Sequence, residues 1–79
     1  MNEATPHYSI VIEWSEDDQT YVVILPEWID HHYVMPVASG KTYAEALKRG
    51  ENALDHLIQI AREDGTPLPA PHLFVASHT

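Results

Sequence analysis

The chain has no cysteine, and only four of its 79 residues are Lys or Arg. The lack of cysteine excludes disulfides, thiolate nucleophiles and cysteine-ligated metal sites, and in so small a domain it favours a reducing compartment, which we take to be the cytoplasm. Twelve acidic residues outnumber the cations and give a formal net charge of −8. Such a balance repels phosphate backbones, so we expect no direct binding of nucleic acid.

Long apolar runs are also missing. The longest, residues 21–26, is too short to span a bilayer, and the first residues have neither the basic nor the apolar region of a signal peptide. We therefore expect no membrane or secretory route. Because 44% of the residues are apolar, the chain is nevertheless expected to fold. We predict a single domain over residues 1–79, with its core at about 8–71 and no separate DNA-binding domain.

Alternation of apolar and polar residues predicts two strands near the start of the chain. Residues 8–14 carry an apolar side chain at every second position, with Trp14 on the face expected in the core. Residues 20–25 are a β-branched run that a proline ends, and the polar segment 15–19 connects the two. An antiparallel hairpin is the simplest pairing.

One long helix is predicted over residues 43–63. Thr42 and Glu45 have the spacing of a capping box at its start, and Gly65, with a proline soon after, is expected to end it. Gly50 lies in the middle of the apolar stripe, which predicts close approach of the helix to a strand. Residues at alternating spacings of four and three form this stripe, which should lie on the sheet: Tyr43, Leu47, Gly50, Leu54, Leu57 and Ala61.

Two shorter strands complete the prediction. Residues 33–38 form a third strand if Pro36 sits at an edge or bulge, and residues 72–76 form a last one. The expected fold is α+β, an antiparallel sheet with one long helix packed on it, in the order β-β-β-α-β.

Candidate cofactor and metal sites are weak. The segment Ser39-Gly40-Lys41-Thr42 is similar to the end of a phosphate-binding loop, but Met35 stands where the first glycine belongs, so a capped helix start is the better interpretation. His31 and His32 are two of six histidines, and adjacent side chains in a strand point to opposite faces. We expect no metal and no cofactor.

Catalysis is not indicated either. No serine or threonine lies in a nucleophile-elbow pattern, and nothing in the sequence makes the carboxylates converge on one site. The chain is therefore not expected to be an enzyme. The carboxylates considered are Glu13, Glu16, Asp17, Asp18, Glu27 and Asp30. Trp28 and Tyr33, in the irregular segment after the second strand, are either lids on the core or exposed anchors of an interface.

Three blocks follow one another in order along the chain. They are Tyr-Val-Val-Ile-Leu-Pro-Glu-Trp at 21–28, Gly-Lys-Thr-Tyr-Ala-Glu-Ala-Leu at 40–47 and Gly-Thr-Pro-Leu-Pro-Ala-Pro at 65–71. In this order the sequence resembles the HicB antitoxin family over about residues 8–71. The resemblance implies a partial ribonuclease-H-like fold. It also implies that the chain neutralises a HicA-type toxin, a small basic mRNA-cleaving ribonuclease, by covering its active surface.

The charge of −8 is complementary to such a partner. We expect stoichiometric protein–protein contact, with the residues that meet the partner being Glu16, Asp17, Asp18, Glu27, Trp28 and Asp30. Exposed sheet edges and a small core also favour self-association as a dimer or tetramer. The alternative is an orphan HicB-like oligomeric scaffold that binds another partner or a small ligand.

Overall fold

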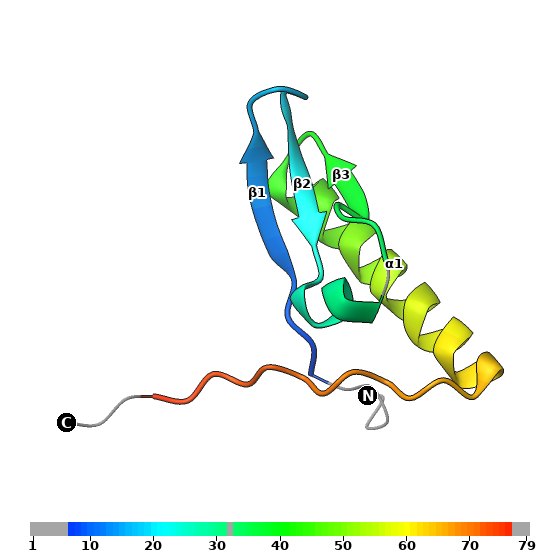
Figure 1. Cartoon of the computed structure of the whole chain (residues 1–79). Coiled ribbons are helices and arrows are strands. Elements are labelled where there is room, and N and C mark those ends of the chain that lie inside the picture. The colour runs from blue at the N-terminus through cyan, green and yellow to red at the C-terminus, as the bar shows by residue number, and fades with distance from the viewer. Residues whose placement is uncertain (1–6, 32, 77–79) are drawn as a thin grey trace.

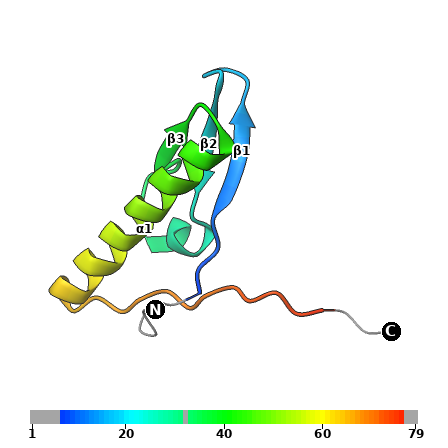
Figure 2. The same cartoon turned by 180° about the vertical axis from the view of Figure 1, so that it is seen from behind.

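Three strands and one long helix make up most of the structure, a computed structural model that describes residues 7–31 and 33–76. The elements, in order, are β1 (Val11–Ser15), β2 (Thr20–Ile24), the short 3-10 helix η1 (Pro26–His31), β3 (Ala38–Gly40) and α1 (Tyr43–Asp64) (Figure 1). The strands form one antiparallel sheet in the order β1-β2-β3. α1 lies against one face of this sheet (Figure 2), so the predicted α+β fold of an antiparallel sheet and one long helix is confirmed.

The predicted hairpin is present, and its two strands pair from Val11 opposite Ile24 to Ser15 opposite Thr20. Residues 16–19 form the turn, in which the Gln19 amide donates to the Ser15 carbonyl at 2.8 Å. The tip of the hairpin projects beyond the start of α1 (Figure 1).

Trp14 was expected in the core, and this expectation is wrong. Its side chain is 47% exposed, and its ring packs at 5.0 Å on Tyr21, which in turn lies 4.3 Å from Tyr43. The three rings form a row at the end of the sheet where α1 begins, so no further turn of helix covers Trp14. The other residues of the same strand face, Tyr8, Ile10 and Ile12, do pack against the core as predicted.

α1 begins and ends as predicted. Thr42 Oγ1 accepts a hydrogen bond from the Glu45 amide at 3.1 Å, Glu45 Oε1 accepts from the Lys41 amide at 2.6 Å, and Gly65 closes the helix with φ of 72°. Among the described residues, no helix combines the length and apolar character that crossing a membrane requires.

The apolar stripe of α1 is confirmed along most of its length. Gly50, Leu54, Leu57 and Ala61 are buried, together with Ala46 and Ile58. Tyr43 and Leu47, in contrast, are exposed, because at the start of the helix the small Ala46 faces the core instead. Small residues there bring the helix backbone close to β3 and β2.

Close approach at Gly50 is confirmed. A Cβ placed on it would lie 2.8 Å from Cγ1 of Val23, a residue of β2 with no exposed surface. Val23, Leu25 and Trp28 are the largest fully buried side chains, and the helix residues of the stripe pack around them. The core therefore lies between β2, η1 and α1.

The structure differs from the prediction for both shorter strands. Of residues 33–38 only Ala38 is in a strand, and β3 continues from there to Gly40, while Tyr33 and Met35 pack against the core from an irregular loop. Residues 72–76 form no strand; from residue 66 the chain runs extended along the base of the domain and past it (Figure 1). A strand requires a neighbouring edge, and this segment meets none in the chain as described.

Candidate functional site

The six residues predicted to contact a partner fall into two groups. Glu16, Asp17 and Asp18 at the hairpin tip and Asp30 on η1 are exposed. Glu27 and Trp28 are 5% and 1% exposed, so neither side chain lies on a surface that a partner can reach. The prediction is corrected for these two residues, and the candidate surface is built from the exposed group.

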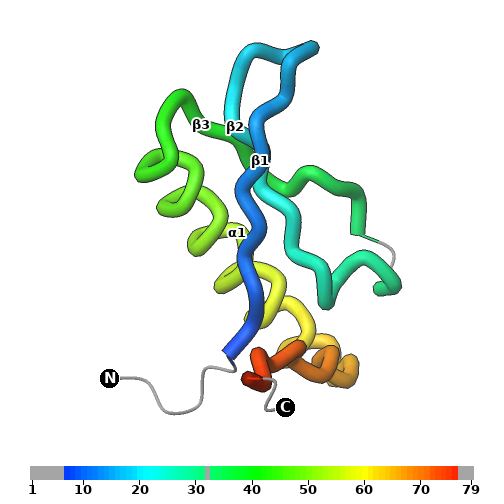
Figure 3. The backbone as a smooth tube through the Cα atoms, turned by 90° about the vertical axis from the view of Figure 1, so that its left-hand side faces the viewer, coloured from blue at the N-terminus to red at the C-terminus, as the bar shows by residue number. Residues whose placement is uncertain are grey.

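The hairpin tip presents three carboxylates in succession. Trp14 Nε1 donates to Glu16 Oε1 at 2.9 Å, Gln19 Nε2 donates to Glu16 Oε2 at 3.4 Å, and Ser15 Oγ donates to Asp18 Oδ2 at 3.3 Å. These donors are neutral, so they orient the carboxylates without offsetting their charge. The tip therefore remains a compact source of negative potential, displayed away from the body of the domain (Figure 3).

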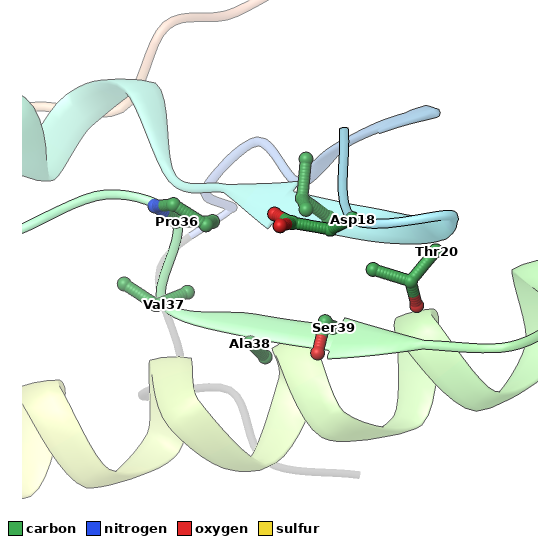
Figure 4. A pocket seen from close by; sticks show the side chains of 7 residues that line it. Asp18, Thr20, Pro36, Val37, Ala38 and Ser39 are labelled. Atoms are coloured by element: carbon green, nitrogen blue, oxygen red, sulfur yellow. The ribbon is translucent and has the colours of Figure 1, made fainter. Parts of the chain in front are cut away.

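A shallow hollow of about 290 Å³ adjoins this tip. Asp18 lines it together with Pro36 and Val37 (Figure 4). Val22 of β2 adds to its apolar lining. An apolar wall beside a carboxylate fits the side chain of Lys or Arg, whose aliphatic stem buries while its cation meets the acid. The hollow is thus suited to a basic side chain of a partner.

A second group of exposed side chains, named here the η1 surface, comprises Ile29, Asp30 and Val34. Ile29 is 50% exposed and Val34 85% exposed, although both belong to the segment that encloses the buried Trp28. Exposed apolar residues beside an acid are typical of protein-contact surfaces.

Trp28 is a lid on the core, which was one of its two interpretations. Its ring meets Tyr8 at 5.5 Å and Tyr33 at 5.7 Å, both edge-on, and the same packing buries Tyr33 in part. The indole nitrogen has no hydrogen-bond acceptor within the described part of the chain. Because Trp28 is buried, it does not belong to the η1 surface.

Glu27 joins two segments that are distant in sequence. Its carboxylate accepts hydrogen bonds from the Ser9 amide at 3.1 and 3.2 Å and from the His72 amide at 2.9 Å. Burial alone would raise the pKa of this carboxyl, but the amide hydrogens of His72, Glu27 itself and Ser9 outweigh burial and hold the pKa below its ordinary value of 4.5. Glu27 is therefore a buried anion that clamps the start of the sheet to the segment after α1.

Tyr8 reinforces this clamp. Its hydroxyl donates to the Pro69 carbonyl at 2.6 Å, and burial, followed by the neighbouring Glu27 charge, raises the pKa of the phenol. Sequence reasoning missed the clamp, since Glu27 was expected to face a partner. The only local signal is the Pro-Glu pair directly after a strand, which marks the chain reversal but not the amides that the carboxylate reaches.

The histidines form no metal centre within the described residues, where no group of three or more His, Asp or Glu side chains converges. His31 lies 6.2 Å from the Trp28 ring, and His32 falls outside the described residues. The Gly40-Lys41-Thr42 segment serves as the capped helix start that the sequence favoured.

Comparison of the chain with protein-family models, with curated proteins and with solved structures finds no match. The fold and the surfaces described above define a small α+β domain with an acidic hairpin tip.

Proposed function

We propose that this chain is a binding protein that captures and neutralises a small basic protein, in the manner of a HicB-like antitoxin acting on a HicA-type toxin. The observation that carries the proposal is the hairpin tip, which exposes three carboxylates in succession. Two of them, Glu16 and Asp18, accept hydrogen bonds, and the side chains that donate these bonds are neutral. Those charges are free to meet cations of a partner.

The three sequence blocks that carry the resemblance also support the proposal, and each has a distinct place in the fold. Residues 21–28 supply β2 and the buried Glu27-Trp28 pair, and residues 40–47 supply the capped start of α1. Residues 65–71 lead from α1 to the His72 amide that Glu27 holds. The blocks are thus the parts that build and close the domain.

The mechanism is electrostatic capture followed by apolar contact. The tip attracts a basic surface from a distance, and the adjoining hollow accepts one Lys or Arg beside Asp18. Ile29 and Val34 then supply apolar area at the η1 surface, which slows dissociation. Covering the cations of an RNA-cleaving protein in this way competes with RNA phosphates for the same charges.

The test begins with a tagged pull-down from native lysate at low and high salt, followed by growth rescue with any small basic partner. The proposal predicts a stoichiometric basic ribonuclease whose toxicity the chain relieves. If only copies of the chain itself are recovered although the lysate contains a small basic HicA-type ribonuclease, the antitoxin proposal is wrong and the scaffold alternative is favoured.

The tip is then tested with the recovered partner by stopped-flow association at low salt. The triple variant Glu16→Gln, Asp17→Asn, Asp18→Asn should reduce the association rate constant by roughly tenfold. Its matched control, Glu51→Gln, Asp55→Asn, Glu63→Gln, removes the same charge from the exposed face of α1. Equal rates for the two triple variants would show that net charge, and not the tip, steers the partner.

A further inference from the structure

Three strongly exposed apolar side chains follow one another at the end of the described chain. Leu73, Phe74 and Val75 are 66%, 93% and 82% exposed, and with Ala76 they form a run without charge, proline or glycine. Residues 73–76, named here the tail, have the composition of a strand but pair with nothing in the chain as described. A run of this kind in water is unfavourable unless another surface covers it.

The sheet offers an edge for such a strand. β1 and β3 are its two edges, and within the described residues no further strand pairs with either. β3 has only three residues, and its Ser39 carbonyl already accepts a hydrogen bond from Arg49 at 3.1 Å. β1 has five residues, so its outer side is the longer row of unpaired backbone groups.

A groove lies beside the segment that leads into β1, lined on this side by His7, Tyr8 and Ile10. It has a volume of about 470 Å³ and lies between the start of the sheet and α1, with Tyr8, Ile10 and Leu54 among its lining. Glu51, Asn52 and Asp55 form its polar rim on the helix. It arises because α1 packs chiefly over β3 and β2 and leaves β1 less covered (Figure 2).

We propose that the tail of one copy adds as a strand to the outer edge of β1 in a second copy, and that the exchange is reciprocal in a dimer. Phe74 then enters the groove between residues 7–10 and α1. Leu73 and Val75, which alternate with it, lie on the helix-free face of the sheet beside Val11. Strand addition of this kind satisfies the backbone groups of β1 and covers the tail in one step.

The position of the tail favours a second copy over the edge of its own β1. Glu27 binds the amides of both Ser9 and His72, so the chain passes the beginning of its own β1 at this point. It then continues extended and away from its sheet (Figures 1 and 2). Folding back would require a turn at residues 72–73, and residues 72–76 contain no glycine, proline, asparagine, aspartate or serine.

Light scattering coupled to size exclusion tests the role of Phe74. The full chain should be a dimer, and Phe74→Asp should be a monomer with an unchanged helical circular dichroism spectrum, because Phe74 lies outside the core. The control Ala70→Asp adds the same charge to an exposed residue just before the clamp and should stay dimeric. A full chain that is monomeric, or a dimer that survives Phe74→Asp, would overturn the proposal.

Disulfide cross-linking identifies the edge that the tail meets. Because the chain has no native cysteine, only the introduced cysteines can form a disulfide. Val11→Cys in β1 lies on the helix-free face, where Val75→Cys is expected beside it. Mixing the two single variants, each with a different tag, should give a mixed disulfide dimer on oxidation, whereas Lys48→Cys on the exposed face of α1 should not link to Val75→Cys. If the double variant Val11→Cys, Val75→Cys gives an internally linked monomer, the tail pairs with its own sheet and the exchange is refuted.

This dimer goes beyond the proposed function and does not depend on it. The oligomeric state is measured on the isolated chain, so the dimer can fail while partner capture holds, or the reverse.

Discussion

Replacing Glu27 with alanine removes the acceptor that ties the Ser9 and His72 amides together across 18 and 45 residues of sequence. A hydrogen bond to a charged group contributes about 1.5–3 kcal/mol, and two donors lose their acceptor. Both hydrogen bonds are only partly buried, so water replaces some of what is lost and the low end of the range applies. We expect Glu27→Ala to reduce the free energy of unfolding by about 2–3 kcal/mol, which lowers Tm by about 10–15 °C in a domain of this size.

The same contact makes the stability of the fold depend on pH. Because the amides hold the pKa of Glu27 below 4.5 in the folded chain, its stabilisation is present above pH 4.5 and is lost as the pH falls through the lowered folded-state pKa. The wild type should therefore lose stability in this acidic range more steeply than Glu27→Gln, which has no carboxyl to titrate there.

Urea unfolding followed by tryptophan fluorescence measures both effects, since Trp28 is buried beside Glu27. The control Glu51→Ala removes one charge from an exposed helix position and should change stability by no more than about 0.5 kcal/mol. Hydrogen exchange should show that Glu27→Ala loses protection at the amides of Ser9 and His72 first. If Glu27→Ala and Glu51→Ala unfold at the same urea concentration, the carboxylate is not the clamp described here.

Two further predictions concern the core. Gly50→Leu should destabilise by about 1–3 kcal/mol in chemical denaturation despite its better helix propensity, because even a Cβ would lie 2.8 Å from the fully buried Val23; equal or greater stability would contradict this packing. Trp28→Ala should reduce the free energy of unfolding by about 3–5 kcal/mol, and Trp14→Ala should reduce it clearly less, because Trp28 is buried and Trp14 is half exposed. Thermal unfolding measures both, and a larger loss for Trp14→Ala would contradict these two environments.

Local features of the sequence determined the main elements. The period-two alternation of residues 8–14 and the β-branched run after it specify the hairpin, because successive strand residues face opposite sides. Thr42 and Glu45 specify the start of α1 through hydrogen bonds that close within four residues. Gly50 indicated the close approach of helix and sheet, since nothing else in the stripe explains a glycine at that position. The exposed acids of the hairpin tip follow from the same local pattern.

Tertiary structure decided which aromatic and acidic side chains are buried. Trp14 lies in a regular strand yet stays half exposed because the helix begins too late to cover it, and Trp28 lies in an irregular segment yet fills the core. Glu27 became a buried clamp because two amides, each far away in sequence, converge on it. Burial depends on what the rest of the chain places over a residue, and no local pattern carries that information.

The same reason explains why residues 72–76 are not a strand. Their composition favours one, but a strand also requires a backbone edge opposite it, and the path after α1 carries this segment past its own sheet (Figure 1). Sequence by itself determined the propensity of the segment. The tertiary structure leaves this segment without a partner strand within the described chain. The reasons are the arrangement of the sheet, the Glu27 clamp and the extended path beyond His72.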